Sequence, residues 1–181
     1  PPRSTLFPYT TLFRSGYLVV NMATYISDVD NTNLTITAQN SAHITVVMNG
    51  LSATLTSSVN WNGTESVSFT VSDGTLNTTG QSNVVVTSVN DAPTINLPAS
   101  FTLTEDGTLN IYMGTYVNDV DTVTLTVTAQ NSTHIFASFT GLSATLTATA
   151  NWSGTEIISF TVSDGLLTAT EIGRASCRER V

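Results

Sequence analysis

Residues 61–74 read WNGTESVSFTVSDG, and residues 152–165 read WSGTEIISFTVSDG. The two stretches lie 91 residues apart, and this offset holds without a gap from residue 16 (paired with 107) to residue 79 (paired with 170). More than half of the paired positions are identical. A fixed period of this length indicates an array of structural modules. The chain therefore contains two copies of one repeat, and its function is expected to depend on an array of such modules.

Apolar residues alternate with Thr and Ser in both copies. Residues 34–38, 51–55 and 67–71 of the first copy show this period of two, and β-branched residues dominate them. Such alternation is typical of half-buried antiparallel strands, and no stretch shows convincing helical periodicity. Turn-forming dipeptides separate the runs, namely Asn-Gly at 49–50 and 62–63 and Asp-Gly at 73–74, 106–107 and 164–165.

These patterns predict about seven short strands in each copy of 91 residues. In the first copy we expect strands at 17–26, 32–38, 43–48, 51–58, 65–72 and 83–89. In the second copy we expect strands at 94–97, 101–104, 108–117, 123–129, 135–139, 142–149 and 156–163. Short strands with frequent turns favour an all-β fold of two tandem Greek-key sandwiches of the immunoglobulin type.

The two ends of the chain do not follow the period. Residues 5–15 read TLFPYTTLFRS and residues 172–181 read IGRASCRERV. Each resembles an in-frame translation of a common sequencing adapter, read on opposite strands of the same DNA. We therefore interpret residues 1–15 and 171–181 as adapter-like artefacts. The two repeats are expected at residues 16–90 and 91–170.

Without these ends, each repeat is expected to lack one terminal strand. Counting back 91 residues from Glu105 and Asp106 reaches residues 14–15, so the first repeat has lost its native first strand. Counting forward from residues 83–89 reaches 174–180, so the second repeat has lost its native last strand. Strand-like pieces of the ends, such as residues 10–13, could dock into the vacant positions.

The charge of the repeats excludes several classes of partner. Residues 16–170 contain eleven carboxylates and no Lys, Arg or Cys, so their formal charge is −11, against −8 for the whole chain. Nucleic acid is excluded because phosphate binding relies on cationic contacts, and an anionic membrane surface is disfavoured for the same reason. No apolar run is long enough to be inserted across a bilayer. The lack of Cys fits an extracellular protein without disulfides.

Several motifs together resemble a known family. They are Asn-Asp-Ala-Pro at 90–93, Thr-Glu-Asp-Gly at 104–107, Asp-Val-Asp at 119–121 and the repeated Trp-x-Gly-Thr-Glu…Phe-Thr-Val-Ser-Asp-Gly. Over residues 16–170 the chain resembles the cadherin-like, immunoglobulin-like tandem repeats of large bacterial surface or secreted adhesin-type proteins. The resemblance implies Greek-key sandwiches strung end to end at the cell surface or outside the cell. It also implies a role in adhesion or spacing, often with calcium.

The acidic residues suggest where calcium would bind. From the predicted strand order we expect Glu65, Asn90, Asp91, Asp119 and Asp121 to converge at the joint between the repeats. Calcium takes six to eight oxygen ligands from carboxylates, carbonyls and water. Cadherins are similar in placing a linker Asp and an Asp-x-Asp pair around inter-domain calcium, although this joint lacks their fuller Asp-x-Asn-Asp-Asn run. The alternative is that these residues only form turns.

Other recurring residues have simpler interpretations. Asp73 and Asp164 precede Gly and fit tight turns. Trp61 and Trp152 are expected to cover the core at a corner of each sandwich, with sugar stacking as the alternative. His43 and His134 are expected to be surface or structural residues, because no Cys or second His lies near them in sequence to complete a metal site. A nucleophile elbow and a phosphate-binding loop are both absent from the sequence, and we expect no catalysis.

The sequence therefore predicts a non-catalytic spacer or adhesion module of a long extracellular protein, whose immediate partners are neighbouring repeats of the same chain. Two alternatives remain open. In one, the repeats bind glycan or a cell-surface protein directly, which requires an exposed aromatic or polar patch that differs between them. In the other, they are accessory modules of a secreted polysaccharide-degrading enzyme.

Overall fold

The computed structural model describes residues 2–4 and 10–179, and the chain divides into two compact units, Pro1–Val89 and Asn90–Val181. Unit 1 contains β1 (Arg3–Ser4), β2 (Thr10–Phe13), β3 (Tyr17–Asn21), η1 (Met22–Thr24), β4 (Ile26–Ser27), β5 (Thr35–Gln39), β6 (Ile44–Asn49), β7 (Ser52–Ser57), β8 (Gly63–Ser72) and β9 (Asn77–Thr87). Unit 2 contains β10 (Thr94–Ile95), β11 (Phe101–Thr104), β12 (Thr108–Tyr112), η2 (Met113–Thr115), β13 (Val117–Asn118), β14 (Thr126–Gln130), β15 (Ile135–Thr140), β16 (Ser143–Ala148), β17 (Gly154–Ser163) and β18 (Thr168–Arg178). Every described element of unit 2 lies 91 residues after its counterpart in unit 1.

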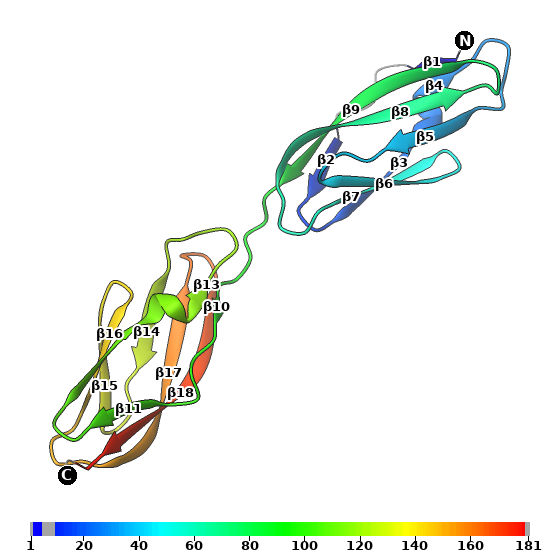
Figure 1. Cartoon of the computed structure of the whole chain (residues 1–181). Helices are drawn as coiled ribbons and strands as arrows, with labels where there is room; N and C mark the ends of the chain where they lie inside the picture. The colour runs from blue at the N-terminus through cyan, green and yellow to red at the C-terminus, as the bar shows by residue number, and fades with distance from the viewer. Residues whose placement is uncertain (1, 5–9, 180–181) are drawn as a thin grey trace. The chain divides into compact units, whose positions relative to one another are not determined.

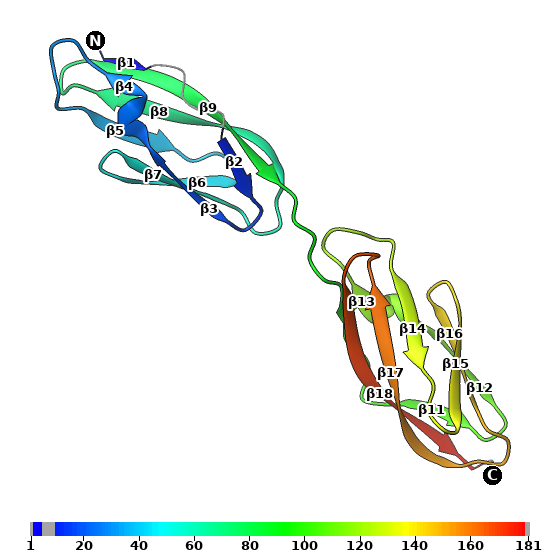
Figure 2. The ribbon, with the colours of Figure 1, turned by 180° about the vertical axis from the view of Figure 1, so that it is seen from behind.

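Each unit is a sandwich of two sheets. In unit 1 the sheets run in the order β2-β9-β8-β5 and β3-β7-β6, and β1 pairs with β4 beside them. Unit 2 repeats this with β11-β18-β17-β14, β12-β16-β15 and the pair β10-β13 (Figures 1 and 2). The pairings β2–β9 and β11–β18 are parallel, whereas the other pairings are antiparallel. The predicted all-β architecture of two sandwiches is confirmed.

The alternating pattern places one face of every long strand in a core. On β8, Val67, Phe69 and Val71 are at most 3% exposed, while the Ser and Thr between them are partly exposed. Each unit has its own apolar cluster drawn from both sheets. Burial of this apolar surface is the main stabilising contribution to each sandwich.

Three strand predictions need correction. The single strands expected at 17–26 and 108–117 are each interrupted by a 3-10 turn, η1 or η2. The turn places Met22 in the core at 1% exposure, with its N–H donating to the carbonyl of Leu51 at 2.8 Å. The chain then leaves one sheet and pairs with β1. The strand expected from residue 83 begins earlier, at Asn77, because β8 and β9 form a long hairpin paired as far as Ser72 and Asn77.

The positions expected to be vacant hold strands formed by the terminal residues. β2 pairs with β9 from Thr10 to Phe13, and β18 continues to Arg178. Residues 1, 5–9 and 180–181 of the predicted adapter-like ends lie outside the described residues. The terminal strand of unit 2 differs from its counterpart in unit 1 in the residues that it places in the core. Ala175 and Cys177 stand where unit 1 has the fully packed Val84 and Val86, and all four are at most 4% exposed.

The helical segments among residues 2–4 and 10–179 are the short turns η1 and η2. No helix in this part of the chain is long and apolar enough to cross a membrane.

Candidate functional site

Four of the five residues predicted to bind calcium lie together in unit 2. Asn90 and Asp91 begin the unit, and Asp119 and Asp121 follow β13 in the loop that leads to β14. The Asp91 N–H donates to Asp121 Oδ2 at 2.7 Å. Asn90 Nδ2 donates to the carbonyl of Asp91 at 3.0 Å and to the carboxylate of Asp164 at 2.7 Å. We call the group Asn90, Asp91, Asp119, Asp121 and Asp164 the acidic pole.

The loop of the acidic pole is shaped by Asp119. Its Oδ1 accepts hydrogen bonds from the N–H groups of Asp121 at 2.7 Å and Thr122 at 2.8 Å. This is a local turn, and Asp28 forms the equivalent turn in unit 1. Asp119 Oδ2 is buried and has no hydrogen-bond partner in the described structure. A buried carboxylate oxygen without a partner is costly, so this atom is the best candidate in the pole for an additional ligand contact.

Asp164 combines a turn role with a contact to the start of the unit. Its Oδ1 accepts from the N–H groups of Leu166 and Leu167, both at 2.6 Å. The bond from Leu167, followed by those from Asn90 and Leu166, lowers the pKa of the Asp164 carboxyl below its usual value. In unit 1 the N–H of Leu76, followed by that of Thr75, lowers the pKa of Asp73 in the same way. The turn interpretation of both residues is confirmed.

The described residues do not assemble a complete metal cage. Among them, no group of three or more His, Cys, Asp or Glu residues is placed to hold a metal ion. Asp121 Oδ2 already accepts from Asp91, and Asp119 Oδ2 is the oxygen without a protein donor. The acidic pole therefore fits a hard cation only in part, and backbone carbonyls and water would have to supply the remaining ligands.

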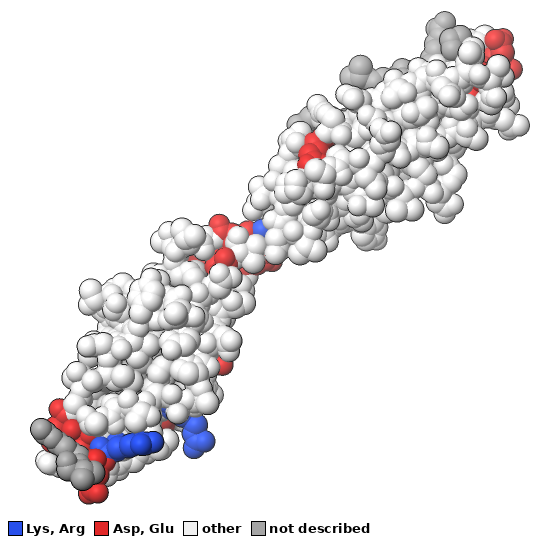
Figure 3. All heavy atoms as spheres, in the orientation of Figure 1, with Lys and Arg blue, Asp and Glu red and all other residues white. Residues whose placement is uncertain are grey.

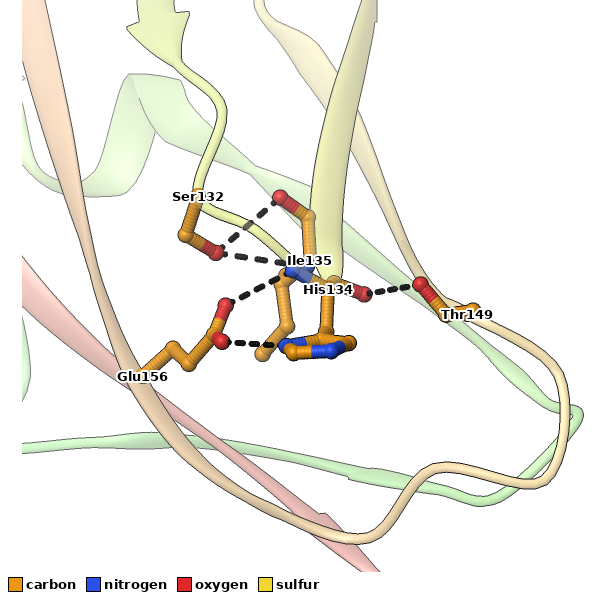
Figure 4. A network of polar contacts seen from close by, with 5 residues as sticks. All are labelled: Ser132, His134, Ile135, Thr149 and Glu156. Atoms are coloured by element: carbon orange, nitrogen blue, oxygen red, sulfur yellow. Dashed lines mark hydrogen bonds and ion pairs between the residues drawn. The ribbon is translucent and has the colours of Figure 1, made fainter.

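Glu65, the fifth predicted ligand, lies in unit 1 and is engaged there. Its Oε1 lies 2.5 Å from Nδ1 of His43, and its Oε2 accepts from the His43 N–H at 3.0 Å and from the Ser41 hydroxyl. Glu156 holds His134 in the same way in unit 2, at 2.6 Å and 2.9 Å (Figure 4). We call these groups the His–Glu clusters. The role of Glu65 as a calcium ligand remains a prediction.

The His–Glu clusters are completed by the tryptophans. His43 stacks on Trp61 with ring centroids 4.7 Å apart and an angle of 2° between the planes, and His134 stacks on Trp152 at 4.9 Å and 2°. Both indole rings also pack against the core of their unit. The predicted role of the tryptophans as core covers is thus confirmed, and the imidazole is held between the carboxylate and the indole.

Hydrogen bonding within the clusters favours the ionised carboxylates. The bond from Ser41, together with those from the His43 ring and backbone, lowers the pKa of Glu65 to about 2. The bonds from Ser132 and then His134 lower the pKa of Glu156 to about 2. Donors that bind the charged form of a carboxyl always act in this direction.

A cluster of Ser, His and Glu invites comparison with a catalytic triad, but the geometry is different. In a triad the serine hydroxyl bonds to the histidine that activates it. Here Ser132 Oγ accepts from the Ile135 N–H and donates to the Ile135 carbonyl, both at 3.2 Å (Figure 4). The Thr149 N–H and hydroxyl anchor the His134 carbonyl at 2.7 and 3.3 Å. The serine hydroxyls thus face the Ile135 backbone and the carboxylates of Glu65 and Glu156, and among the described residues no bond joins them to the histidine rings as in a triad; the cluster instead fixes a strand end.

Sequence reasoning missed the pairing of His43 with Glu65. The signal was available, because Ser-x-His and Thr-Glu both recur 91 residues later with the same spacing of 22 residues. Recurrence in step marks both residues as part of the shared scaffold, and the contacts show that they pair. The charged groups on the rest of the surface are sparse, and Figure 3 shows acidic side chains in small groups on a largely uncharged surface.

Comparison with known proteins agrees with this fold. Residues 15–87 match the family model described as Cadherin-like domain, and residues 90–172 match the one described as Bacterial Ig domain. A crystal structure of human protocadherin-24 EC1-2 is similar at 16% identity and a TM-score of 0.59, covering 98% of each chain. Protocadherin gamma B7 extracellular domains 1–4 are similar at 9% identity and a TM-score of 0.53, covering 95% of this chain and 49% of that one. At these identities the likeness shows the fold alone.

Among other solved structures, an endo-fucoidan hydrolase from glycoside hydrolase family 107 aligns at 19% identity and a TM-score of 0.43. The alignment covers 99% of this chain, which spans 29% of the length of that hydrolase. No curated protein sequence matches the chain.

Proposed function

We propose that this pair of domains, one cadherin-like and one of the bacterial immunoglobulin type, is a non-catalytic spacer and adhesion module of a longer extracellular protein. The observation that carries the proposal is the recurrence of every described element at a constant offset of 91 residues. A repeat array contacts mainly its neighbours, so each unit contributes length and stiffness. Domains of these two families are typically extracellular, which supports a place at the cell surface.

Calcium is the proposed cofactor, and the acidic pole of unit 2 is its proposed site. Asp119 would provide its partnerless Oδ2, and Asp91 and Asp121 would provide further oxygens. At the weak affinities of extracellular modules, calcium at ten times its Kd would stabilise unit 2 by about 1.4 kcal/mol. The larger proposed effect is to restrain the segment that leads into Asn90, which would stiffen the joint between the repeats.

Calcium titration tests this proposal directly. We expect isothermal titration to show millimolar or tighter binding that is lost in Asp121→Asn and retained in Asp30→Asn, the equivalent substitution in unit 1. Small-angle scattering should change on addition of EDTA. Absence of binding heat together with identical scattering profiles would count against a calcium joint. Loss of binding in Glu65→Gln would establish Glu65 as a ligand, and unchanged binding would remove it from the site.

A further inference from the structure

We propose that unit 2 carries a binding surface for a neutral polysaccharide, centred on the ring of Tyr112. This inference goes beyond the spacer role, because a spacer needs no ligand. It rests on four features of the described structure, namely an exposed aromatic ring, two hollows beside that ring, the charge of their lining and a difference between the two repeats.

Tyr112 is an exposed aromatic residue whose ring lies over the backbone of η2. It is 61% exposed at the end of β12, immediately before η2. Its ring lies against Gly114, where an added Cβ would come within 2.6 Å of the ring atoms Cε1 and Cζ. Only glycine at position 114 therefore permits this position of the ring. A tyrosine has only two side-chain torsions, so it loses little conformational entropy on binding a ligand.

Two hollows meet at Tyr112. One is lined on its polar side by Ser100, Thr102, Asn110 and Thr115. The other is lined on its polar side by Asn118, Asp119 and Thr122. Tyr112 lines both hollows, so an extended ligand that crosses the ring could enter both. A platform with polar groups on either side matches a sugar chain, whose C–H faces pack on aromatic rings while its hydroxyls donate and accept hydrogen bonds.

The residues that line the two hollows favour an uncharged polysaccharide. Neither hollow is lined by Lys or Arg among the described residues, and Asp119 is the charged residue that they contain. In the calcium-free protein a sulfated or uronic acid chain would meet the Asp119 carboxylate and no cation, which disfavours it electrostatically. Hydroxyl and amide groups of Ser, Thr and Asn can pair with sugar hydroxyls as donors or acceptors. The chemical class of ligand is therefore a neutral polysaccharide.

The comparison with unit 1 separates this surface from the scaffold. At the position equivalent to Tyr112, Asn21 accepts a hydrogen bond from the Ala23 N–H at 3.1 Å and so caps η1. Tyr112 makes no such side-chain bond to η2. Unit 2 thus replaces a capping residue by an exposed aromatic and replaces Ala23 by the glycine that accommodates the ring. Residues that break a local rule of stability are expected at functional positions.

Affinity gel electrophoresis of the full chain in a buffer with EDTA, which keeps Asp119 free of calcium, tests the proposal. The gels would contain laminarin, barley β-glucan, xyloglucan or galactomannan as neutral chains, and dextran sulfate as the anionic comparison. We expect retarded migration in at least one neutral gel and none with dextran sulfate. The substitution Tyr112→Asn, which introduces the unit 1 residue, should weaken the binding about tenfold or more, as for loss of an anchoring aromatic.

The matched control is Tyr17→Ala. Tyr17 is 73% exposed on β3 of unit 1 and lines neither hollow, so its loss should leave the binding unchanged. Melting curves of both variants would establish that they are folded. The proposal is overturned if no neutral polysaccharide retards the chain, if only dextran sulfate does, or if folded Tyr112→Asn binds as tightly as the unsubstituted chain.

Discussion

Replacing Ala175 by Val is expected to stabilise unit 2. Ala175 lies on β18 in the segment that we interpret as adapter-like, and it is fully buried. Its counterpart 91 residues earlier, Val84 on β9, is also fully buried. If the native strand carried Val here, Ala175 buries two carbon atoms fewer than the native residue would.

The expected gain in stability follows from the two carbon atoms that Val adds to the core. Two carbon atoms at about 0.8 kcal/mol each would add about 1.5 kcal/mol to the free energy of unfolding of unit 2. For a domain of this size, 1 kcal/mol shifts the melting temperature by about 4–8 °C, so the expected rise is several degrees. The opposing effect is overpacking, which costs about 1–3 kcal/mol. It is a real alternative because Ala175 pairs with Phe101, whereas Val84 pairs with the smaller Thr10.

Differential scanning calorimetry of the whole chain is the assay. Val84→Ala serves as the partner substitution in unit 1. It should lower the free energy of unfolding of that unit by about 2 kcal/mol or more, and the transition that moves to lower temperature is then assigned to unit 1. A higher melting temperature of unit 2 in Ala175→Val supports a foreign terminal strand. A lower one would mean that Ala175 is matched to Phe101, and the argument that the C-terminal segment does not belong to the repeat would fail.

Two further predictions concern the His–Glu clusters. Because the pKa of Glu156 is lowered to about 2 from its usual 4.5, its carboxylate stabilises unit 2 fully above pH 4.5, and this stabilisation is lost as the pH falls towards 2. Calorimetry between pH 6 and 2.5 should therefore show a smaller fall in the melting temperature of unit 2 for Glu156→Gln, and parallel curves would contradict this. Gly154→Ala places a Cβ 2.8 Å from Cζ2 of Trp152, whose ring is stacked on His134, so we expect about 1–3 kcal/mol of destabilisation and altered tryptophan fluorescence. Gly141→Ala has open space at its Cβ but a φ of +59°, so it should cost some stability through backbone strain while it leaves the fluorescence of the folded chain unchanged.

Much of the fold could be predicted from the sequence because apolar and polar residues alternate along the strands with a period of two. The runs around Leu55 and Phe69 are half-buried strands as expected. The turns η1 and η2 could not be predicted in this way, since Met22 continues the apolar alternation and only its tertiary contact with Leu51 shows that the chain leaves the sheet. Periodicity records which side of a strand is buried, but it does not record where a strand changes sheet.

The candidate site was less accessible to sequence reasoning because carboxylates have several uses. Asp91 and Asp121 are in contact as expected. Glu65, which looks equally suitable as a ligand, instead has both oxygens engaged by Ser41 and His43. Spacing alone does not distinguish a carboxylate that awaits a metal from one that its own fold satisfies. Atomic contacts add that Asp119 retains an oxygen without a hydrogen-bond partner in the described structure, and the calcium role of each of these carboxylates remains a prediction.

The repeat itself offers a way to separate scaffold from function. Positions that keep the same residue and the same contacts in both units, such as His43 with Glu65 and their counterparts, serve the shared fold. Positions where the scaffold is the same but the residue breaks a local preference need another reason. Tyr112 gives up the capping contact that Asn21 makes, on a backbone that is repeated in both units. Because both units solve the same folding problem, stability alone does not account for such a difference, and a ligand specific to unit 2 does.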